Sequence, residues 1–335
     1  MSPQAAQRLA REAVVQSFDL AARALNEDWG TRYDGTQVQR YAEKLGRRVV
    51  QRQQAEVRAY EQGRRPEGPA NDPDLLVVGM DGGRWQGREK NPDTGSRWKE
   101  DKVLTMTSYR RGDGQDKPPR PLVTSYVATT QDCRAFGRLA RVEAERRGIR
   151  QARTVLHISD GGNWIDPLHQ EQFFRHERIL DYYHAVEHLY QVARAVHPQN
   201  EGSRQELGQQ LERWLWRGQV QGVLKVLGAW AQTLGPPQES DGPEHPRRVV
   251  SQNVGYFTKH REHVNYPAYR ARGWPIGSGP TEAGVKLMNK RVKGTEQFWR
   301  PEGAEAILAL RALWVSQDER WPHYWWYGRL LREAA

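Results

Sequence analysis

The chain has 335 residues, 37% of them hydrophobic, which is enough for one large core or two smaller ones and excludes an intrinsically disordered protein. Lys and Arg number 51 against 41 Asp and Glu, and the net charge of +10 favours a polyanionic partner. Neither a membrane-spanning run of roughly 20 apolar residues nor a signal-peptide core is present, so we expect a cytoplasmic protein without a membrane partner. The single cysteine, Cys133, excludes an internal disulfide and a multi-cysteine zinc ribbon.

The N-terminal part is expected to be helical. Apolar residues at a spacing near 3.6 predict a helix over residues 5–25, with Gly30 as its stop. Thr36 is a candidate cap for a second helix that ends at Gly46, and a basic third helix follows. This order fits a helix-turn-helix DNA-binding unit or a plain helical platform. The proline-rich stretch 63–74 predicts a linker.

In the middle of the chain, short apolar runs predict a β-sheet. The expected strands cover residues 75–80, 102–110, 121–130, 154–159 and 179–183, with helices over 133–147 and 167–176. This order of three strands, helix, strand, helix, strand is typical of a ribonuclease-H-like sheet. A helical, Trp-rich pattern then predicts an all-helical insertion, and helical signals return after Gly279 and over 301–315.

We therefore predict an α/β protein with a ribonuclease-H-like mixed five-stranded sheet, flanking helices and an all-helical insertion before the last core helix. The predicted divisions are an N-terminal helical, helix-turn-helix-like segment (1–66), the first part of the ribonuclease-H-like domain (74–184), the insertion (185–270) and the final core helix with C-terminal helices (271–335).

Two aspartates follow apolar runs and each precedes two glycines. Asp81 is followed by Gly82-Gly83, and Asp160 by Gly161-Gly162. A carboxylate at the end of a buried strand, beside glycines that allow a ligand to approach, is well placed to point into a crevice. The alternative is that both are turn aspartates, because Asp-Gly is a strong hairpin signal.

A third acid, Glu282, is expected in the first turn of a helix capped by Ser278 or Thr281. The same helical face then carries, at steps of four, four and three residues, Lys286, Lys290 and Lys293. Such a face fits an acid that holds a metal while its helix binds phosphates. The alternative is a solvated charged face in which Glu282 and Lys286 form a surface pair, and composition leaves both open.

Five blocks of sequence follow one another in a characteristic order. They are Val78-Gly-Met-Asp-Gly-Gly-Arg-Trp-Gln86, Arg97-Trp-Lys-Glu-Asp-Lys102, Ser159-Asp-Gly-Gly-Asn-Trp-Ile165, Ile179-Leu-Asp-Tyr-Tyr-His-Ala-Val-Glu-His188 and Pro275-Ile-Gly-Ser-Gly-Pro-Thr-Glu-Ala283. With these blocks the chain resembles DDE-type insertion-sequence transposases, in particular those of the ISKra family, from about Leu75 to Trp326. The resemblance implies a ribonuclease-H-like catalytic domain whose acidic triad is Asp81, Asp160 and Glu282.

The resemblance also implies a chemistry and partners. The triad would hold two divalent ions, Mg²⁺ or Mn²⁺, with Asp81 contacting both, for DNA cleavage and strand transfer. Arg84 and the three lysines would bind phosphates of double-stranded transposon ends and target. Asp181 and His184 match an aspartate-two-residues-histidine motif and are expected to support the acids or handle a DNA strand. We expect a nucleoid-associated prokaryotic protein acting as a homodimer or higher synaptic multimer.

Several alternatives stay open. The same metal site would serve a nuclease that cuts without joining, and a domesticated transposase derivative would bind DNA without catalysis. Residues 184–188 match the H-x-x-E-H signature of zinc peptidases, although a third ligand is not evident. Paired acids also occur in glycosidases. Family members often carry zinc-binding cysteines ahead of the catalytic domain, which this sequence lacks, so the resemblance does not extend to recognition of transposon ends.

Overall fold

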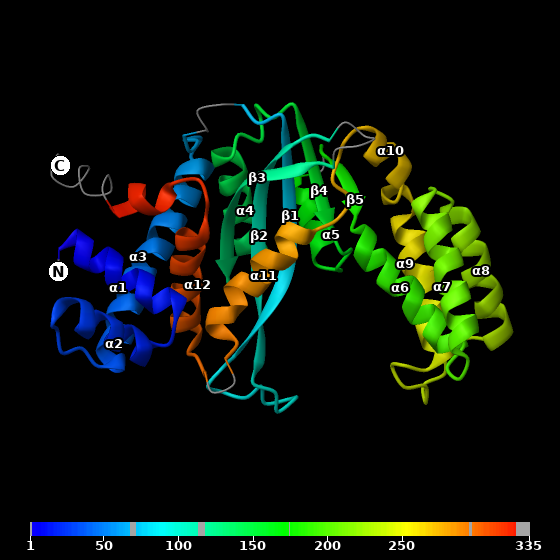
Figure 1. The fold of residues 1–335 in the computed structure, drawn as a ribbon, viewed down its shortest axis with the longest axis horizontal. Helices are drawn as coiled ribbons and strands as arrows, with labels where there is room; N and C mark the ends of the chain where they lie inside the picture. The colour runs from blue at the N-terminus through cyan, green and yellow to red at the C-terminus, as the bar shows by residue number, and fades with distance from the viewer. Residues whose placement is uncertain (1, 68–71, 113–117, 174, 295–296, 326–335) are drawn as a thin grey trace.

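A computed structural model of the chain describes residues 2–67, 72–112, 118–173, 175–294 and 297–325. The molecule is elongated, with the N-terminal helices at one end, a β-sheet in the centre and a bundle of helices at the other end (Figure 1). The linker expected over 63–74 and the predicted segment 271–335 lie partly outside the described residues.

Five strands form one mixed sheet in the order β3-β2-β1-β4-β5. They are β1 (Leu75–Gln86), β2 (Trp98–Arg110), β3 (Arg120–Thr129), β4 (Thr154–Ser159) and β5 (Glu177–Leu180). The β1–β2 and β2–β3 pairs are antiparallel, whereas β4 pairs in parallel with both β1 and β5. This α/β arrangement is compatible with the ribonuclease-H-like sheet expected from the sequence.

The central strand β1 is longer than predicted. Its first half is buried on both faces, which explains its uninterrupted apolar run. The strand then continues through Asp81-Gly82-Gly83 to Gln86, each residue paired with β2. The prediction that Asp81 ends the strand was therefore wrong, and so was the alternative of a hairpin turn there, because the paired β2 satisfies the backbone groups of the glycines.

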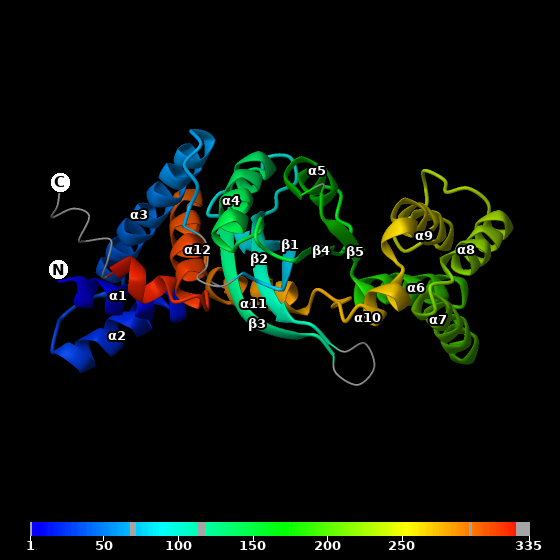
Figure 2. The same cartoon turned by 90° about the horizontal axis from the view of Figure 1, so that it is seen from above.

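Helices cover both faces of the sheet. On one face lie α4 (Cys133–Arg146), α5 (Ile165–Leu168) and the π-helical segment η1 (His169–Phe173), and on the other α11 (Gly279–Val292). Figure 2 shows α4 and α5 on one side of β1 and α11 on the other. Gly79 of β1 allows α11 to approach, because a β-carbon there would lie 1.9 Å from Oγ1 of Thr281. The single helix predicted over 167–176 was wrong in its bounds and type.

Three helices form the N-terminal end: α1 (Pro3–Val15), α2 (Phe18–Trp29) and α3 (Gly35–Glu61). The single helix predicted over 5–25 was wrong, because the Ser17 hydroxyl caps a separate α2. Gly30 ends α2 with a positive φ of 62°, as expected. Asp34, and not Thr36, caps α3 through a reciprocal capping box with Gln37.

The predicted helix end at Gly46 was also wrong. Gly46 lies inside α3, where the helix crosses α12 (Pro301–Val315), and a β-carbon there would lie 2.2 Å from the backbone oxygen of Ala306. The glycine serves close helix packing and does not break the helix. Through this contact α1, α2 and α3 share one hydrophobic core with α11 and α12.

The insertion consists of helices that lie between β5 and α11. They are α6 (Tyr182–Val196), α7 (Glu201–Trp216), α8 (Val220–Leu234), α9 (Pro246–His260), the 3₁₀ turn η2 (Arg261–His263) and α10 (Tyr266–Ala271). Their core is continuous with the sheet, since Leu156 and Ile158 of β4 belong to the same buried cluster as Leu189 and Phe257. No helix among the described residues combines the length and apolar character needed to cross a bilayer.

Candidate functional site

Three acids that are far apart in the sequence line one cavity. Asp81, Asp160 and Glu282 belong to the wall of a cavity of about 300 Å³ between β1, the end of β4, the start of α6 and α11. The remaining lining residues are Met80, Ser159, Tyr183, His184, Glu187, Ser278 and Thr281. The cavity therefore gathers the three predicted acids from three separate parts of the chain, together with a fourth carboxylate, Glu187.

Asp81 is positioned by strand alternation. Because Gly79 and Gly83 face α11, the side chain of Asp81 between them faces α11 as well. Burial raises the pKa of Asp81 to about 6, and the negative charge of Asp160 adds to this effect. The backbone N–H of Gly82, which donates to Oδ1 of Asp81 at 2.6 Å, lowers the pKa, whereas Glu282 raises it further. A cation among these carboxylates would relieve the repulsion.

Asp160 directly follows the last residue of β4, so it lies at the end of an apolar strand as the sequence predicts. Gly161 adopts a φ of 86°, which favours glycine, and the N–H of Gly162 donates to Oδ1 of Asp160 at 2.9 Å. The hydroxyl of Tyr256 on α9 donates to the carbonyl of Asp160 at 2.8 Å. The insertion thus helps to fix the backbone that carries this acid.

Glu282 lies in the first turn of α11 and is half exposed. Its Oε2 is 3.6 Å from Nζ of Lys286, so the surface pair expected as the alternative does form. The same carboxylate lines the acid cavity. Ser278 is the N-cap of α11, but neither its hydroxyl nor that of Thr281 makes the predicted capping hydrogen bond; Thr281 bonds to Thr105 instead.

The start of α11 is held by Asp181. This buried carboxylate accepts from the backbone N–H of His184 at 2.8 Å through Oδ1, capping α6, and from the N–H of Ser278 through Oδ2. The predicted fifth strand, 179–183, was too long because its last residues belong to this capped helix. Asp181 therefore fixes the start of both α6, which carries His184, and α11, which carries Glu282.

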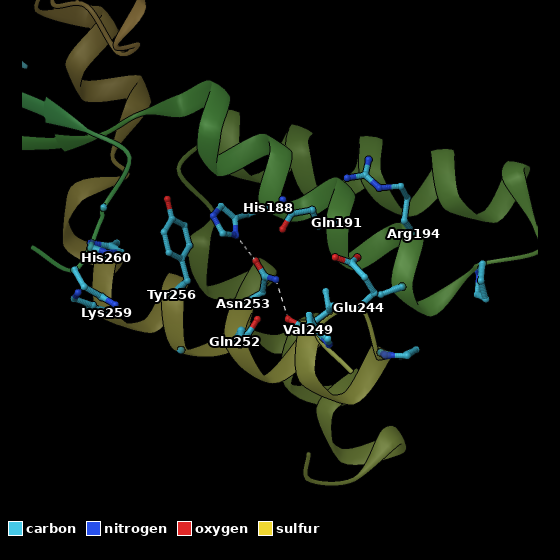
Figure 3. A pocket seen from close by; sticks show the side chains of 17 residues that line it. His188, Gln191, Arg194, Glu244, Val249, Gln252, Asn253, Tyr256, Lys259 and His260 are labelled. Atoms are coloured by element: carbon cyan, nitrogen blue, oxygen red, sulfur yellow. Dashed lines mark hydrogen bonds between the residues drawn. The ribbon is translucent and has the colours of Figure 1, made fainter. Parts of the chain in front are cut away.

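The two histidines of the H-x-x-E-H match have different surroundings. His184 lines the acid cavity, with Nδ1 3.7 Å from Oε2 of Glu187. The imidazole of His188 instead stacks on Tyr256, with ring centres 4.1 Å apart, and bonds to Asn253 at 2.8 Å (Figure 3). In the part of the chain that the structure describes, no three His, Cys, Asp or Glu side chains are placed so that they could hold a metal ion.

A larger cavity of about 1010 Å³ adjoins the acids. It lies between α6 and α9 and reaches Gly161, the residue that follows Asp160. Figure 3 shows its polar wall, to which Gln191, Arg194 and Gln252 contribute.

The predicted phosphate-binding residues do not form one group. Lys286, Lys290 and Lys293 are exposed along α11. Arg84 is exposed but follows Gly83, whose α-carbon faces α11, so strand alternation directs Arg84 to the opposite face of the sheet. The structure thus keeps the three lysines together and separates Arg84 from them.

Asp101 on β2 is a further acid that the sequence reasoning missed. It is fully buried opposite Gly83, and the side-chain amide of Asn289 on α11 donates to both of its carboxylate oxygens at 3.2 Å. Burial, the largest cause, raises the pKa of Asp101 to about 7, and Asp81 contributes to the rise. The only signal was its place in the Arg97–Lys102 block, since a buried carboxylate has no periodicity of its own.

Comparison with known proteins gives a distant likeness. The chain is similar to a solved structure described as "Drosophila P element transposase strand transfer complex", with a TM-score of 0.32 and 9% sequence identity. The overlap covers 76% of this chain and 80% of that chain. No protein-family model and no curated protein matches the sequence. At this level the likeness decides neither the family nor the function.

Proposed function

We propose that the chain is a metal-dependent polynucleotidyl transferase of the DDE type, a DNA transposase, with Asp81, Asp160 and Glu282 as its catalytic acids. The observation that carries the proposal is their convergence on one cavity, where two of them raise the pKa of the third. Acids that repel one another in a cleft are characteristic of sites that bind a cation or move a proton.

The chemistry of the donors fits hard divalent ions, although the three acids are not placed in this structure so that they could hold one together. Carboxylate oxygens without cysteine are ligands that suit Mg²⁺ and Mn²⁺, and Asp81, Asp160 and Glu282 would hold them. Bound ions would supply stabilisation of charge on the phosphodiester and its leaving oxygen. The protein contributes the rest: Asp181 positions Glu282, and the lysines of α11 bind phosphates on either side of the cleaved bond.

Double-stranded DNA is the proposed partner, because the net charge is +10 and the exposed lysines of α11 extend from the acids. Joining two transposon ends requires more than one copy of the protein, so we propose a homodimer or higher multimer on DNA. Light scattering of the protein with and without DNA measures this.

The test is the Asp160→Asn variant, assayed for Mn²⁺-dependent nicking of supercoiled plasmid DNA. The substitution removes one negative charge with little change in volume, so cleavage should fall by a factor of about 10³ or more while folding and DNA binding persist. Asp72→Asn is the matched control, because Asp72 is exposed and does not line the cavity. Unchanged cleavage by Asp160→Asn would remove this acid from the site.

The products separate the remaining functions. Joined strands on the plasmid indicate a transposase, whereas cleavage without joined products indicates a nuclease. Calorimetric titration with Mn²⁺, with and without DNA, should give heat in the wild type and less in Asp160→Asn. No heat in either condition, together with peptide cleavage that requires zinc, would favour the peptidase reading of residues 184–188.

A further inference from the structure

Beside the far end of α11 lies a surface whose exposed aromatic residues the proposed reaction does not use. Trp98 and Phe298 are exposed aromatic residues, 43% and 41% accessible. Nζ of Lys293 lies 5.8 Å from the ring centre of Trp98, and the guanidinium carbon of Arg97 lies 5.1 Å from that of Phe298. We call these four residues the aromatic patch. Each exposed ring in the patch has a cation beside it.

The backbone holds the aromatic patch in place. Segments far apart in sequence meet here: the N–H of Trp299 donates to the carbonyl of Gln86 at 2.9 Å, and the N–H of Arg88 donates to the carbonyl of Trp299 at 2.9 Å. The side chain of Arg88 also donates to the carbonyl of Phe298 at 3.3 Å. The end of β1 thereby fixes Phe298, and little ordering entropy is lost when a ligand binds.

The surroundings of the patch are basic. Exposed cations flank it on the β1–β2 loop, on α11 and at the start of α12, namely Arg88, Lys90, Lys290 and Arg300, and the half-buried Lys99 lies on β2. None of these, nor Arg97 or Lys293, forms an ion pair with a carboxylate among the described residues, whereas Arg141 and Arg146 of α4 are paired. Exposed aromatic rings within unpaired positive charge favour a polyanion with flat groups over an apolar protein surface.

The patch lies along the same helix as the acid cavity. Glu282 and Lys293 are eleven residues apart on α11, which corresponds to about 16 Å along a helix. That length corresponds to about five phosphates along one DNA strand, at a spacing of about 3.4 Å per phosphate. The exposed Lys286 and Lys290 lie between the two ends. Figure 1 shows α11 crossing the sheet towards the end of β1 and the start of β2.

We propose that the aromatic patch binds unpaired DNA bases, a few nucleotides from the phosphodiester held at the acids. Bases stack on Trp98 and Phe298, and Arg97 and Lys293 bind the adjoining phosphates. Single-stranded DNA is favoured over duplex because paired bases already cover one another's faces, whereas unpaired bases leave theirs free to stack. The position of the strand rests on the proposed function, but binding to the patch is measurable without catalysis.

The experiment measures binding of a short labelled oligothymidine, and of a duplex of equal length, by fluorescence anisotropy in the full chain. Trp98→Ala should weaken oligothymidine binding by about tenfold or more, the effect of losing one stacked base, and change duplex binding much less. Trp98→Phe keeps an aromatic ring and should retain most of the affinity. Trp29→Ala is the matched control, because Trp29 is also 43% exposed but has no cation beside it among the described residues.

An equal loss from Trp29→Ala, or unchanged oligothymidine binding by Trp98→Ala in a protein with an unshifted melting temperature, would overturn the proposal. Equal loss for duplex and single strand would overturn it as well. The Asp160→Asn variant keeps the two proposals separate. If Trp98→Ala lowers oligothymidine binding but Asp160→Asn still cleaves DNA, the aromatic patch is supported and the catalytic proposal fails. If Asp160→Asn abolishes cleavage but Trp98→Ala binds oligothymidine normally, the catalytic proposal is supported and the patch proposal fails.

Discussion

Asp181 shows how one side chain can control a site that it does not line. Both carboxylate oxygens accept backbone N–H groups, one at the start of α6 and one at the start of α11. Both ends carry residues of the acid cavity, His184 and Glu282. The role expected for Asp181, support of the acids or contact with DNA, stays a prediction, and its hydrogen bonds favour support.

Asp181→Asn tests this role. An amide keeps one acceptor oxygen but presents an NH₂ group to the second N–H, so one buried donor loses its partner at a cost of about 1–3 kcal/mol. We expect a lower melting temperature, and a loss of cleavage that exceeds the loss of DNA binding because the start of α11 shifts. Asp132→Asn is the matched control, since Asp132 is an exposed helix cap with a single acceptor role. Equal effects of both substitutions would contradict the assignment.

Glu143 makes stability depend on pH. Burial of this carboxylate on α4 would raise its pKa, but Arg320 and Arg146 outweigh burial and lower it to about 2, from the ordinary 4.5. A pKa below that of the unfolded chain stabilises the fold at neutral pH, and this contribution is lost as the pH falls from about 5 towards 2.

Glu143→Gln should therefore destabilise the protein at pH 7 by about 1.5–3 kcal/mol, because the partly buried Arg146 and Arg320 each lose one of their two carboxylate partners. The variant should also lose less stability than the wild type between about pH 5 and pH 3. Urea denaturation at both pH values measures this. Glu239→Gln is the matched control, because Glu239 is exposed and has no partner among the described residues. It should change neither the stability at pH 7 nor the loss of stability between pH 5 and pH 3. If the stability of the wild type and of Glu143→Gln falls equally as the pH is lowered, the low pKa of Glu143 is not what makes stability depend on pH.

At the scale of single residues, local patterns marked Asp81, Asp160 and Glu282 as candidates but left turn and surface roles open. The resemblance grouped them as a triad, and their catalytic role stays a prediction. The same patterns did not reveal Asp101 or the double cap of Asp181. Their importance comes from contacts with Asn289 and Ser278, each nearly one hundred residues or more away. Such contacts leave no periodic trace in a single sequence.

Among the elements, β4, α11 and α12 were predicted well because turn and cap residues mark their boundaries, such as Gly161 after β4 and the prolines in the first turns of α11 and α12. The failures were at glycines. Gly46 was interpreted as a helix end and Gly82-Gly83 as the end of a strand, but these glycines allow another element to approach or continue a paired strand. Sequence alone does not separate a glycine that turns the chain from one that makes room.

Gly46→Ala tests the packing role. Alanine favours a helix over glycine by about 1 kcal/mol, so a glycine without neighbours should give a more stable variant. At Gly46 the added methyl would overlap the carbonyl of Ala306 and separate α3 from α12, for a net loss of about 1–3 kcal/mol. Gly228→Ala on α8 is the matched control, because nothing lies within 4 Å of its added methyl. In thermal unfolding, Gly46→Ala should lower the melting temperature and Gly228→Ala should raise it. A higher melting temperature in both variants would contradict the packing contact at Gly46.

For the whole molecule, the question is where the net charge of +10 acts. Many arginines are paired inside the fold, for example Arg146 and Arg320 with Glu143. Lys290 and Lys293 at the far end of α11 have no carboxylate partner among the described residues. Lys290 lies between the acid cavity and the aromatic patch, and Lys293 belongs to the patch. Composition predicted a polyanionic partner, but only the fold shows which charges remain free to meet one.

Lys290→Ala should weaken duplex DNA binding and lower the slope of log K against log salt by about one unit, the contribution of one phosphate contact. Lys225→Ala removes an equally exposed charge from α8, at the opposite end of the molecule from the N-terminal helices (Figure 1). If DNA follows α11, this control leaves the slope unchanged although the net charge falls by the same amount. If both variants lower the slope equally, the net charge attracts DNA without a defined site and α11 is not the DNA-binding surface.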